Sequence, residues 1–167
     1  MQRRAFASSL VALASAGGLA GCGFHLRQAP SFAFSSIYLA SNSAFGIELR
    51  RNLEAGGKIA VIRDPAQRDT AQVILDVLQD QRERIVLGYN SAGQVREFQL
   101  RFRVRFRLRT PDDRELLPPT EILLQQDQSY DETLALAKEA EAQLIYRNLQ
   151  TDVVQQIMRR LAAVKAI

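Results

Sequence analysis

The chain of 167 residues contains one cysteine, one histidine and no tryptophan. Because Cys22 has no second thiol to pair with, no intramolecular disulfide can form, and the fold must rest on packing alone. Because His25 is the only histidine, we expect neither a transition-metal site nor a Ser-His-acid triad. A glycine motif that could cradle a phosphate group is also missing. These absences predict a protein that is not an enzyme and that uses no metal and no cofactor.

Long hydrophobic runs are missing after Cys22, where no segment approaches the roughly 20 apolar residues of a membrane-spanning helix. The composition, 47% hydrophobic and 24% charged, is typical of a globular protein. A large excess of basic charge is missing as well. The formal charge of +4 comes from 22 Lys and Arg against 18 Asp and Glu, and it falls to 20 − 18 = +2 without Arg3 and Arg4. The placement of the arginines therefore matters more than their number.

The N-terminal residues carry the features of a secretory signal peptide in their usual order. Arg3 and Arg4 precede an apolar run at residues 5–16, and small residues follow. Residues 19–22, Leu-Ala-Gly-Cys, resemble the lipobox of bacterial lipoproteins, in which the cysteine is acylated and the chain is cut before it. Two interpretations remain at this point, an acylated Cys22 and an ordinary signal peptide with a stray cysteine.

The lipobox interpretation divides the chain into three parts. Gly23 follows the cysteine where an Asp often signals retention in the inner membrane, so we expect a lipid-anchored protein of the outer membrane that faces the periplasm. The expected parts are a cleaved signal peptide at 1–21, a lipid-anchored tether at 22–33 and a single periplasmic domain at 34–167.

Periodicity along the rest of the chain predicts an α+β two-layer sandwich. A largely antiparallel or mixed sheet of about four strands should be covered on one face by two helices, which leaves its other face open. We expect the last helix to begin at a capping box made by Ser129 and Glu132. The predicted strands are 34–40, 72–87, 95–110 and 115–128, with a short extended segment at 59–62, and the predicted helices are 43–55 and about 132–164.

The clearest pattern is a strict alternation of apolar and polar residues from Phe98 to Arg109. Because side chains in a strand alternate between faces, five arginines should point from the open face, about 7 Å apart. Neighbouring strands offer Asp76, Asp80, Glu121 and Asp127 as partners. One interpretation is therefore a solvated face with cross-strand ion pairs. The other is a docking surface for phosphate or carboxylate groups, which guanidinium binds in a bidentate way. An exported lipoprotein seldom meets nucleic acid, so we expect no nucleic-acid partner. The five arginines of the alternating pattern are Arg101, Arg103, Arg105, Arg107 and Arg109.

Residues 22–27, Cys-Gly-Phe-His-Leu-Arg, resemble the mature N-terminus of the LptE family of lipopolysaccharide-assembly lipoproteins, also called rare lipoprotein B. Residues 51–54 (Arg-Asn-Leu-Glu), 97–98 (Glu-Phe) and 135–138 (Ala-Leu-Ala-Lys) are similar to further family elements, in the same order. The resemblance implies a non-catalytic lipoprotein that plugs an LptD-type β-barrel. It also implies support for lipopolysaccharide insertion and direct lipopolysaccharide binding through basic side chains.

The resemblance makes Lys138, in the Ala-Leu-Ala-Lys stretch, the first candidate for contact with lipopolysaccharide or the barrel. The arginines of the alternating strand are further candidates, and Arg82 and Arg84 are weaker ones. Residues 88 and 89, Gly-Tyr, depart from the basic character expected there. Two rival functions stay open, a lipoprotein that binds anionic envelope ligands without a barrel, and a hydrolase of the cell envelope. The candidates for this contact in the alternating strand are Arg101, Arg103, Arg105 and Arg107.

Overall fold

The computed structural model describes residues 30–167. The expected signal peptide, Cys22 and most of the expected tether lie outside these residues. The described part contains five strands, two α-helices and two short 3-10 helices. In chain order they are β1 (Ser36–Tyr38), α2 (Ala44–Glu54), β2 (Ala60–Ile62), η2 (Pro65–Thr70), β3 (Val73–Tyr89), β4 (Val95–Arg109), β5 (Glu115–Ser129), η3 (Glu132–Leu134) and α3 (Ala135–Ala162).

The strands form one mixed sheet in the order β2-β1-β3-β4-β5. The three long strands β3, β4 and β5 make an antiparallel meander, and β1 pairs in parallel with both β2 and β3. The sheet therefore has five strands rather than about four. The difference arises because the short segment after α2 is extended and pairs with β1, a contact that periodicity over three residues cannot reveal.

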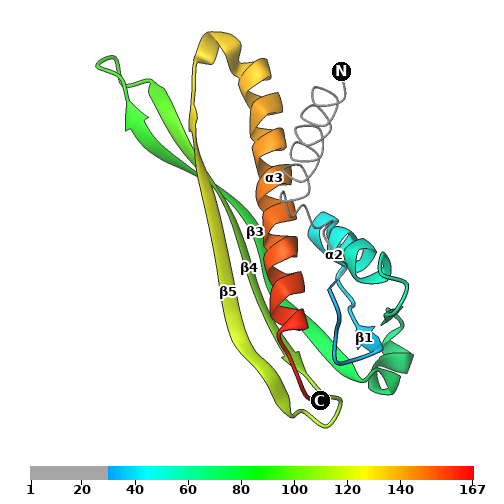
Figure 1. Ribbon diagram of the computed structural model, residues 1–167. Helices are drawn as coiled ribbons and strands as arrows, with labels where there is room; N and C mark the ends of the chain where they lie inside the picture. Colours follow the sequence, from blue (N-terminus) through cyan, green and yellow to red (C-terminus); the bar gives the residue numbers. More distant parts are fainter. Residues whose placement is uncertain (1–29) are drawn as a thin grey trace, which may run out of the picture.

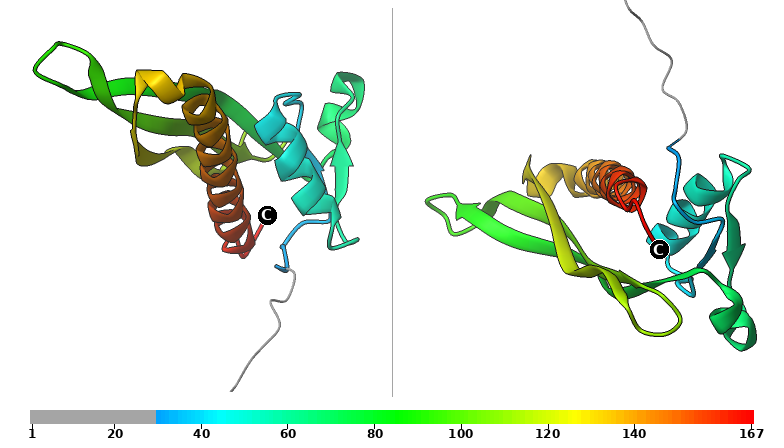
Figure 2. Two further views of the ribbon diagram at one scale, coloured as in Figure 1. Left: turned by 90° about the horizontal axis from the view of Figure 1, so that it is seen from above. Right: turned by 60° about the horizontal axis from the view of Figure 1, so that its bottom comes forward.

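Both α-helices lie on the same face of the sheet, which confirms the expected α+β two-layer architecture. Figure 1 shows α3 running along the length of the meander, with the β3–β4 hairpin extending past its start. Figure 2 shows α2 beside α3, next to the short strands. None of the helices among residues 30–167 is both long enough and apolar enough to cross a membrane.

The core fills the space between the helices and this face of the sheet. Alternate residues of β4 contribute Leu100, Phe102, Val104, Phe106 and Leu108, none of which is more than 1% exposed. Helix α2 adds Phe45, Leu49 and Leu53, and α3 adds a stripe from Ala142 to Leu161. The apolar side chains that recur along the helices and the strand thus pack together in one hydrophobic cluster, as expected for amphipathic elements.

The observed starts of the two α-helices agree with those predicted from the sequence only in part. The sequence offers Asn42 or Ser43 as the cap of α2, and it is the hydroxyl of Ser43 that accepts a hydrogen bond from the backbone N–H of Gly46 at 3.0 Å. The predicted capping box before α3 is wrong. Residue Ser129 is the last residue of β5, and Asp131 caps a 3-10 turn by accepting from the N–H of Thr133. Strand pairing of β5 with β4 through Ser129 displaces the start of the helix.

Strand β5 is one edge of the sheet and contains the Pro118–Pro119 pair, which in a strand favours an edge position, a bulge or a bend. The register between β4 and β5 shifts between Phe106 and Leu108, whose partners are Thr120 and Leu117. Pro118 and Pro119 lie between Leu117 and Thr120. The two residues of β5 that have no backbone N–H to donate therefore occupy the stretch where the register shifts.

Candidate functional site

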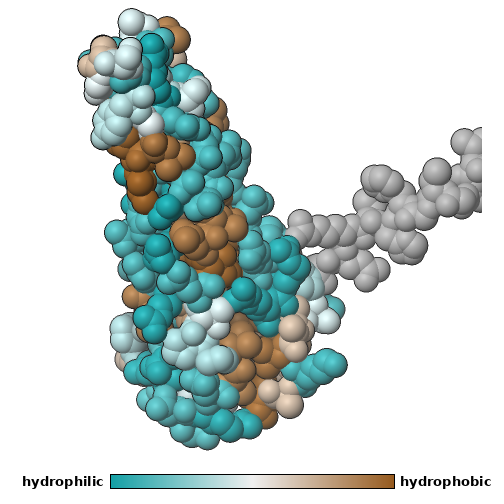
Figure 3. Space-filling model, turned by 90° about the vertical axis from the view of Figure 1, so that its left-hand side faces the viewer, coloured by the Kyte–Doolittle hydropathy of each residue, from teal (hydrophilic) through white to brown (hydrophobic). Residues whose placement is uncertain are grey.

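The candidate surface is the face of the meander that points away from α3. Cross-strand register places Arg101, Arg103, Arg105 and Arg107 of β4 on this face, opposite polar residues of β3 and mostly polar residues of β5. Figure 3 shows the side of the molecule turned away from α3, which is mostly hydrophilic with separate hydrophobic patches. We call this surface the open face.

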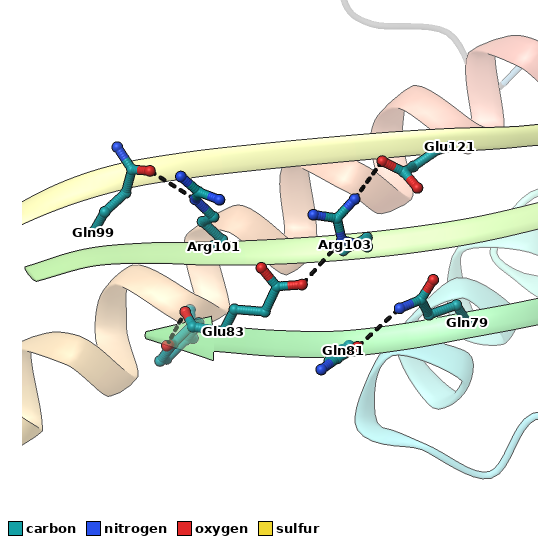
Figure 4. Close-up of polar contacts among 8 residues, drawn as sticks. Gln79, Gln81, Glu83, Gln99, Arg101, Arg103 and Glu121 are labelled. Carbon is teal, nitrogen blue, oxygen red and sulfur yellow. Dashed lines mark hydrogen bonds and ion pairs between the residues drawn. The ribbon is translucent and has the colours of Figure 1, made fainter. Parts of the chain in front are cut away.

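The middle of the open face is a ladder of paired polar groups. The guanidinium of Arg103 donates to Glu83 of β3 at 3.0 Å and to Glu121 of β5 at 2.6 Å. Arg101 donates to Gln99 at 2.6 Å, two residues away on the same strand. Figure 4 shows these side chains reaching along and across the strands. The hydrogen bond with Glu83 raises the pKa of the Arg103 guanidinium further above its ordinary value, so this group stays charged.

One end of the open face is closed, which the alternation does not predict. Arg107 and Arg109 both donate to Asp76 at 2.8 Å, and Arg109 is only 7% exposed. A second small hydrophobic cluster lies at this end of the face, next to Arg109, which pairs with Ile74 in the strand register. The cluster consists of Tyr38, Ala71 and Ile74, with Ile62 against it. The expectation that all five arginines point into solvent is therefore wrong for Arg109.

Two of the four expected acidic partners bind arginines of the ladder, and two do not. Asp76 and Glu121 form ion pairs with arginines, whereas Asp127 accepts from the amide of Gln99 at 2.9 Å. Asp80 lies on the other face, opposite Val104, where its carboxylate accepts from the hydroxyl of Ser43. A register shift between Val77 and Gln79 reverses the facing of β3 there, next to the break in the polar-apolar pattern of the sequence at residues 79–83.

Arg105 differs from the other arginines of the ladder. It is exposed, and its side chain makes no ion pair or hydrogen bond within residues 30–167. Glu121 lies opposite Arg105 in the register, but its carboxylate binds Arg103 instead. Among the arginines of the open face, Arg103 and Arg107 bind carboxylates and Arg101 binds a neutral amide, so Arg105 is the one without a polar partner within the described residues.

Arg82 and Arg84 lie on the helix side of β3, not on the open face. The guanidinium of Arg82 donates to Gln150 of α3 at 3.1 Å and lies 5.3 Å from the ring centroid of Tyr146. Arg84 binds Glu139 of α3 at 3.0 Å and stacks 4.1 Å from the ring centroid of Phe98. Both side chains tie the first half of α3 to the sheet.

Lys138 is in the first turn of α3, near the end of β5. Its ammonium lies 2.9 Å from Glu141 and 3.2 Å from the hydroxyl of Ser129, and its side chain is 19% exposed. The contact with Lys138 lowers the pKa of the Glu141 carboxyl. The structure thus separates the candidates into the open face, the helix side and the start of α3, instead of gathering them in one pocket.

Sequence analysis missed the apolar residues on the open face. Leu123 of β5 lies opposite Arg103 and is 37% exposed, and Ile85 of β3 lies opposite Gln99. The signal was present in β5, where three apolar residues follow one another at 122–124. In a strand such a run must place at least one apolar side chain on each face.

No group of three or more His, Cys, Asp or Glu residues within 30–167 is arranged to hold a metal ion. The fold and the open face define a class of protein, an α+β two-layer domain whose sheet is covered by helices on one face and carries polar and arginine side chains on the other.

Comparison with known proteins places the chain within this class. The model of the LptE family, described as lipopolysaccharide-assembly, matches residues 34–161. The solution structure of an uncharacterized lipoprotein B from Nitrosomonas europaea is 31% identical, with a TM-score of 0.70 over 84% of this chain and 91% of that one. The chain belongs to the LptE family, which confirms the resemblance carried by its motifs.

Two further solved structures share the fold at lower identity. The rare lipoprotein B from Shewanella oneidensis is 22% identical, with a TM-score of 0.61 over 77% of this chain and 92% of that one. The minor lipoprotein from Acinetobacter baumannii is 21% identical, with a TM-score of 0.62 over 80% and 94%. A search of curated proteins found no match. The family is one of lipopolysaccharide-assembly lipoproteins and not a known enzyme family.

Proposed function

We propose that this protein is an outer-membrane lipoprotein, anchored through Cys22, that plugs an LptD-type β-barrel and supports insertion of lipopolysaccharide into the outer leaflet. The observation that carries the proposal is the combination of membership in the LptE family with a sheet that is covered by helices on one face only. Its other face is available for a partner of polar character.

The chemistry of the open face suits the inside of a barrel. Barrel lumens are polar, so a protein that fills one needs a polar surface with few unpaired charges. The ladder fits this need, since Arg101, Arg103 and Arg107 already have partners. Each exposed pair contributes at most about 1 kcal/mol, so the guanidinium groups can exchange partners at little cost to the fold.

Arg105 is the residue of the open face that we assign first to the partner. It has no partner to lose, so a carboxylate or phosphate of the barrel or of lipopolysaccharide would gain a charge-assisted pair without breaking another. Arg101, Arg103 and Arg107 would bind by exchange with their present partners. Leu123, which lies opposite Arg103 on the open face, offers an apolar contact to the same partner.

Lys138 stays our candidate for contact with lipopolysaccharide at the start of α3. Its ammonium contacts the hydroxyl of Ser129 and the carboxylate of Glu141, and a phosphate group would compete with that carboxylate. Arg82 and Arg84 are weaker candidates, because each holds α3 against the sheet and could bind lipid only by releasing that contact.

The plug proposal is tested by purification from outer membranes in mild detergent. The wild-type protein should elute with a much larger barrel protein, and Arg105→Glu should reduce the recovered barrel at least several-fold. Arg147→Glu is the matched control, because Arg147 is exposed on α3 and should leave recovery unchanged. A wild-type protein that elutes alone would instead support the rival, a lipoprotein that binds anionic ligands without a barrel.

The anchor is tested separately, with Cys22→Ser. We expect this variant to move from the membrane fraction to the soluble fraction while its domain stays folded, because removal of long acyl chains removes the anchor. Mass spectrometry of the native protein should show an acylated N-terminal cysteine. An unmodified thiol on an uncut chain would refute the anchor while leaving the barrel experiment to be judged on its own.

A further inference from the structure

A cavity of about 480 Å³ lies between the C-terminal ends of α2 and α3, and none of the candidate residues assigned above lines it. The two helices run side by side in the same direction, since Glu48 binds Gln150 and Asn52 binds Gln155. Their last turns then diverge around the cavity. Along α3, the distance from Lys138 to this end is about 30 Å at roughly 1.5 Å per residue.

The walls of the cavity are mostly apolar, with the hydrogen-bonded amides of Asn52 and Gln155 on one side, and two cations line it as well. Leu53, Ile59 and Met158 are buried and form the inner wall, and Pro30 and Phe32 line another side. Lys58 and Arg159 line the cavity too, both are exposed, and neither forms an ion pair within residues 30–167. An apolar hollow with a few polar groups at its edge is the usual form of a small-molecule site.

We infer that this cavity binds the acyl chain of a single-chain anionic amphiphile, a long-chain carboxylate, with its headgroup between Lys58 and Arg159. The volume is about three times the roughly 150 Å³ that accommodates benzene, which gives room for a chain of about 12 to 16 carbons. The site goes beyond the proposed plug function and does not depend on it.

The charges near the cavity favour an anion over a cation. The C-terminal ends of α2 and α3 each carry about half a negative charge, which opposes an anionic headgroup. Lys58 and Arg159 supply two full positive charges at the rim, so the balance is about one positive charge. A neutral or cationic headgroup would leave this excess uncompensated.

Met158 provides a direct reporter of binding. The sequence contains only two methionines, Met1 and Met158, and Met158 lines the cavity. In the full chain carrying Cys22→Ser, which avoids detergent, the ¹³C methyl signal of Met158 is assigned by its loss in Met158→Leu. Sodium dodecanoate below its micelle concentration should shift this signal in a saturable way. Butyrate, which has the same headgroup and a short chain, should not.

Two variants and one further probe test the chemistry of the site. Lys58→Glu with Arg159→Glu should weaken dodecanoate binding at least tenfold, whereas Arg160→Glu with Lys165→Glu, at the same end of α3, should change it less than twofold. Ala55→Trp should abolish the saturable shift, because Ala55 is exposed and lines the cavity, so the indole fills it without disturbing the core. Dodecyltrimethylammonium should bind at least tenfold more weakly than dodecanoate.

The inference is overturned if dodecanoate leaves the Met158 signal unmoved, if the cationic amphiphile binds equally well, or if the charge-reversed rim binds as tightly as the wild type. Circular dichroism of each variant verifies that the domain is folded. Since the measurement needs no barrel, a negative result here leaves the plug proposal untouched, and loss of barrel co-purification leaves this site untouched.

Discussion

The two faces of β4 differ more than any other pair of surfaces in the molecule, although their residues alternate along one strand. On the covered face, Leu100 to Leu108 are at most 1% exposed and pack under α2 and α3. On the open face, the intervening arginines are half-buried or exposed, and all but Arg105 bind neighbouring side chains. The comparison indicates that one face holds the fold together, whereas the other can serve a partner at little cost in stability.

The largest effect should come from the covered face. Phe102 is 1% exposed and its ring centroid lies 6.0 Å from that of Phe45, so Phe102→Ala should lower the free energy of unfolding by about 3–5 kcal/mol. Arg101→Ala, the adjacent residue on the open face, should lower it by less than about 1 kcal/mol. Urea denaturation of both variants measures the difference. Equal losses would show that the open face is part of the core.

Asp76 is the exception on the open face and should give the second largest effect. It is the shared acceptor of Arg107 and Arg109, and Arg109 is almost fully buried. Asp76→Asn removes the better buried of the two carboxylates that bind Arg109 and leaves only the exposed Asp113 at 3.4 Å. We therefore expect a loss of about 2 kcal/mol in the free energy of unfolding.

Asp127→Asn is the matched control for this prediction, because Asp127 accepts only from Gln99 on the same face. Its effect should be under about 1 kcal/mol in the same denaturation experiment. If the two aspartate variants are equally stable, burial of Arg109 contributes nothing, and the open face is uniform along its length.

The architecture was predictable where periodicity is long and regular. The alternation from Phe98 to Arg109 correctly predicted β4 and its two faces, and the candidate caps Asn42 and Ser43 correctly predicted the start of α2. The family followed from short motifs and is confirmed over residues 34–161. The anchor at Cys22 stays a prediction.

What sequence reasoning missed has one physical cause, long-range contact that overrides a local pattern. A register shift at Val77 moved Asp80 to the helix side, and Arg109 is buried next to the second hydrophobic cluster. Pairing of β5 with β4 through Ser129 removed the predicted capping box. The sequence shows a break in pattern at residues 79–83, beside the register shift, but it does not report which residues these contacts bring together. The cavity between the helix ends is likewise made by residues that are distant in sequence.

Arg84 tests whether cations on the covered side of the sheet act structurally, in contrast to those of the open face. Its guanidinium stacks on Phe98, lies 5.8 Å from the ring centroid of Tyr130 and binds Glu139. Arg84→Ala should lower the free energy of unfolding by about 1 kcal/mol and speed hydrogen exchange in the first turns of α3. Arg96→Ala, which removes only a 3.9 Å contact with Asp131, should leave exchange in α3 unchanged. Unchanged exchange in both variants would mean that α3 docks without Arg84.

The smallest effect should be a pH dependence that arises on the helix side. Hydrogen bonds from Gln143 and Arg84 lower the pKa of the Glu139 carboxyl below its ordinary value of 4.5. Because the folded-state pKa is the lower one, Glu139 contributes stability above about pH 4.5 and loses that contribution as the pH falls through the folded-state pKa. Glu139→Gln should therefore flatten the fall in stability between pH 5 and pH 3, measured by urea denaturation at each pH. Glu54→Gln is the control, since the Glu54 carboxylate has no hydrogen bond or ion pair within residues 30–167, and the slope should not change. An unchanged slope in Glu139→Gln would show that the start of α3 is held by apolar and ring contacts alone. The covered side of the sheet would then be a purely apolar interface, and its contrast with the open face would be greater.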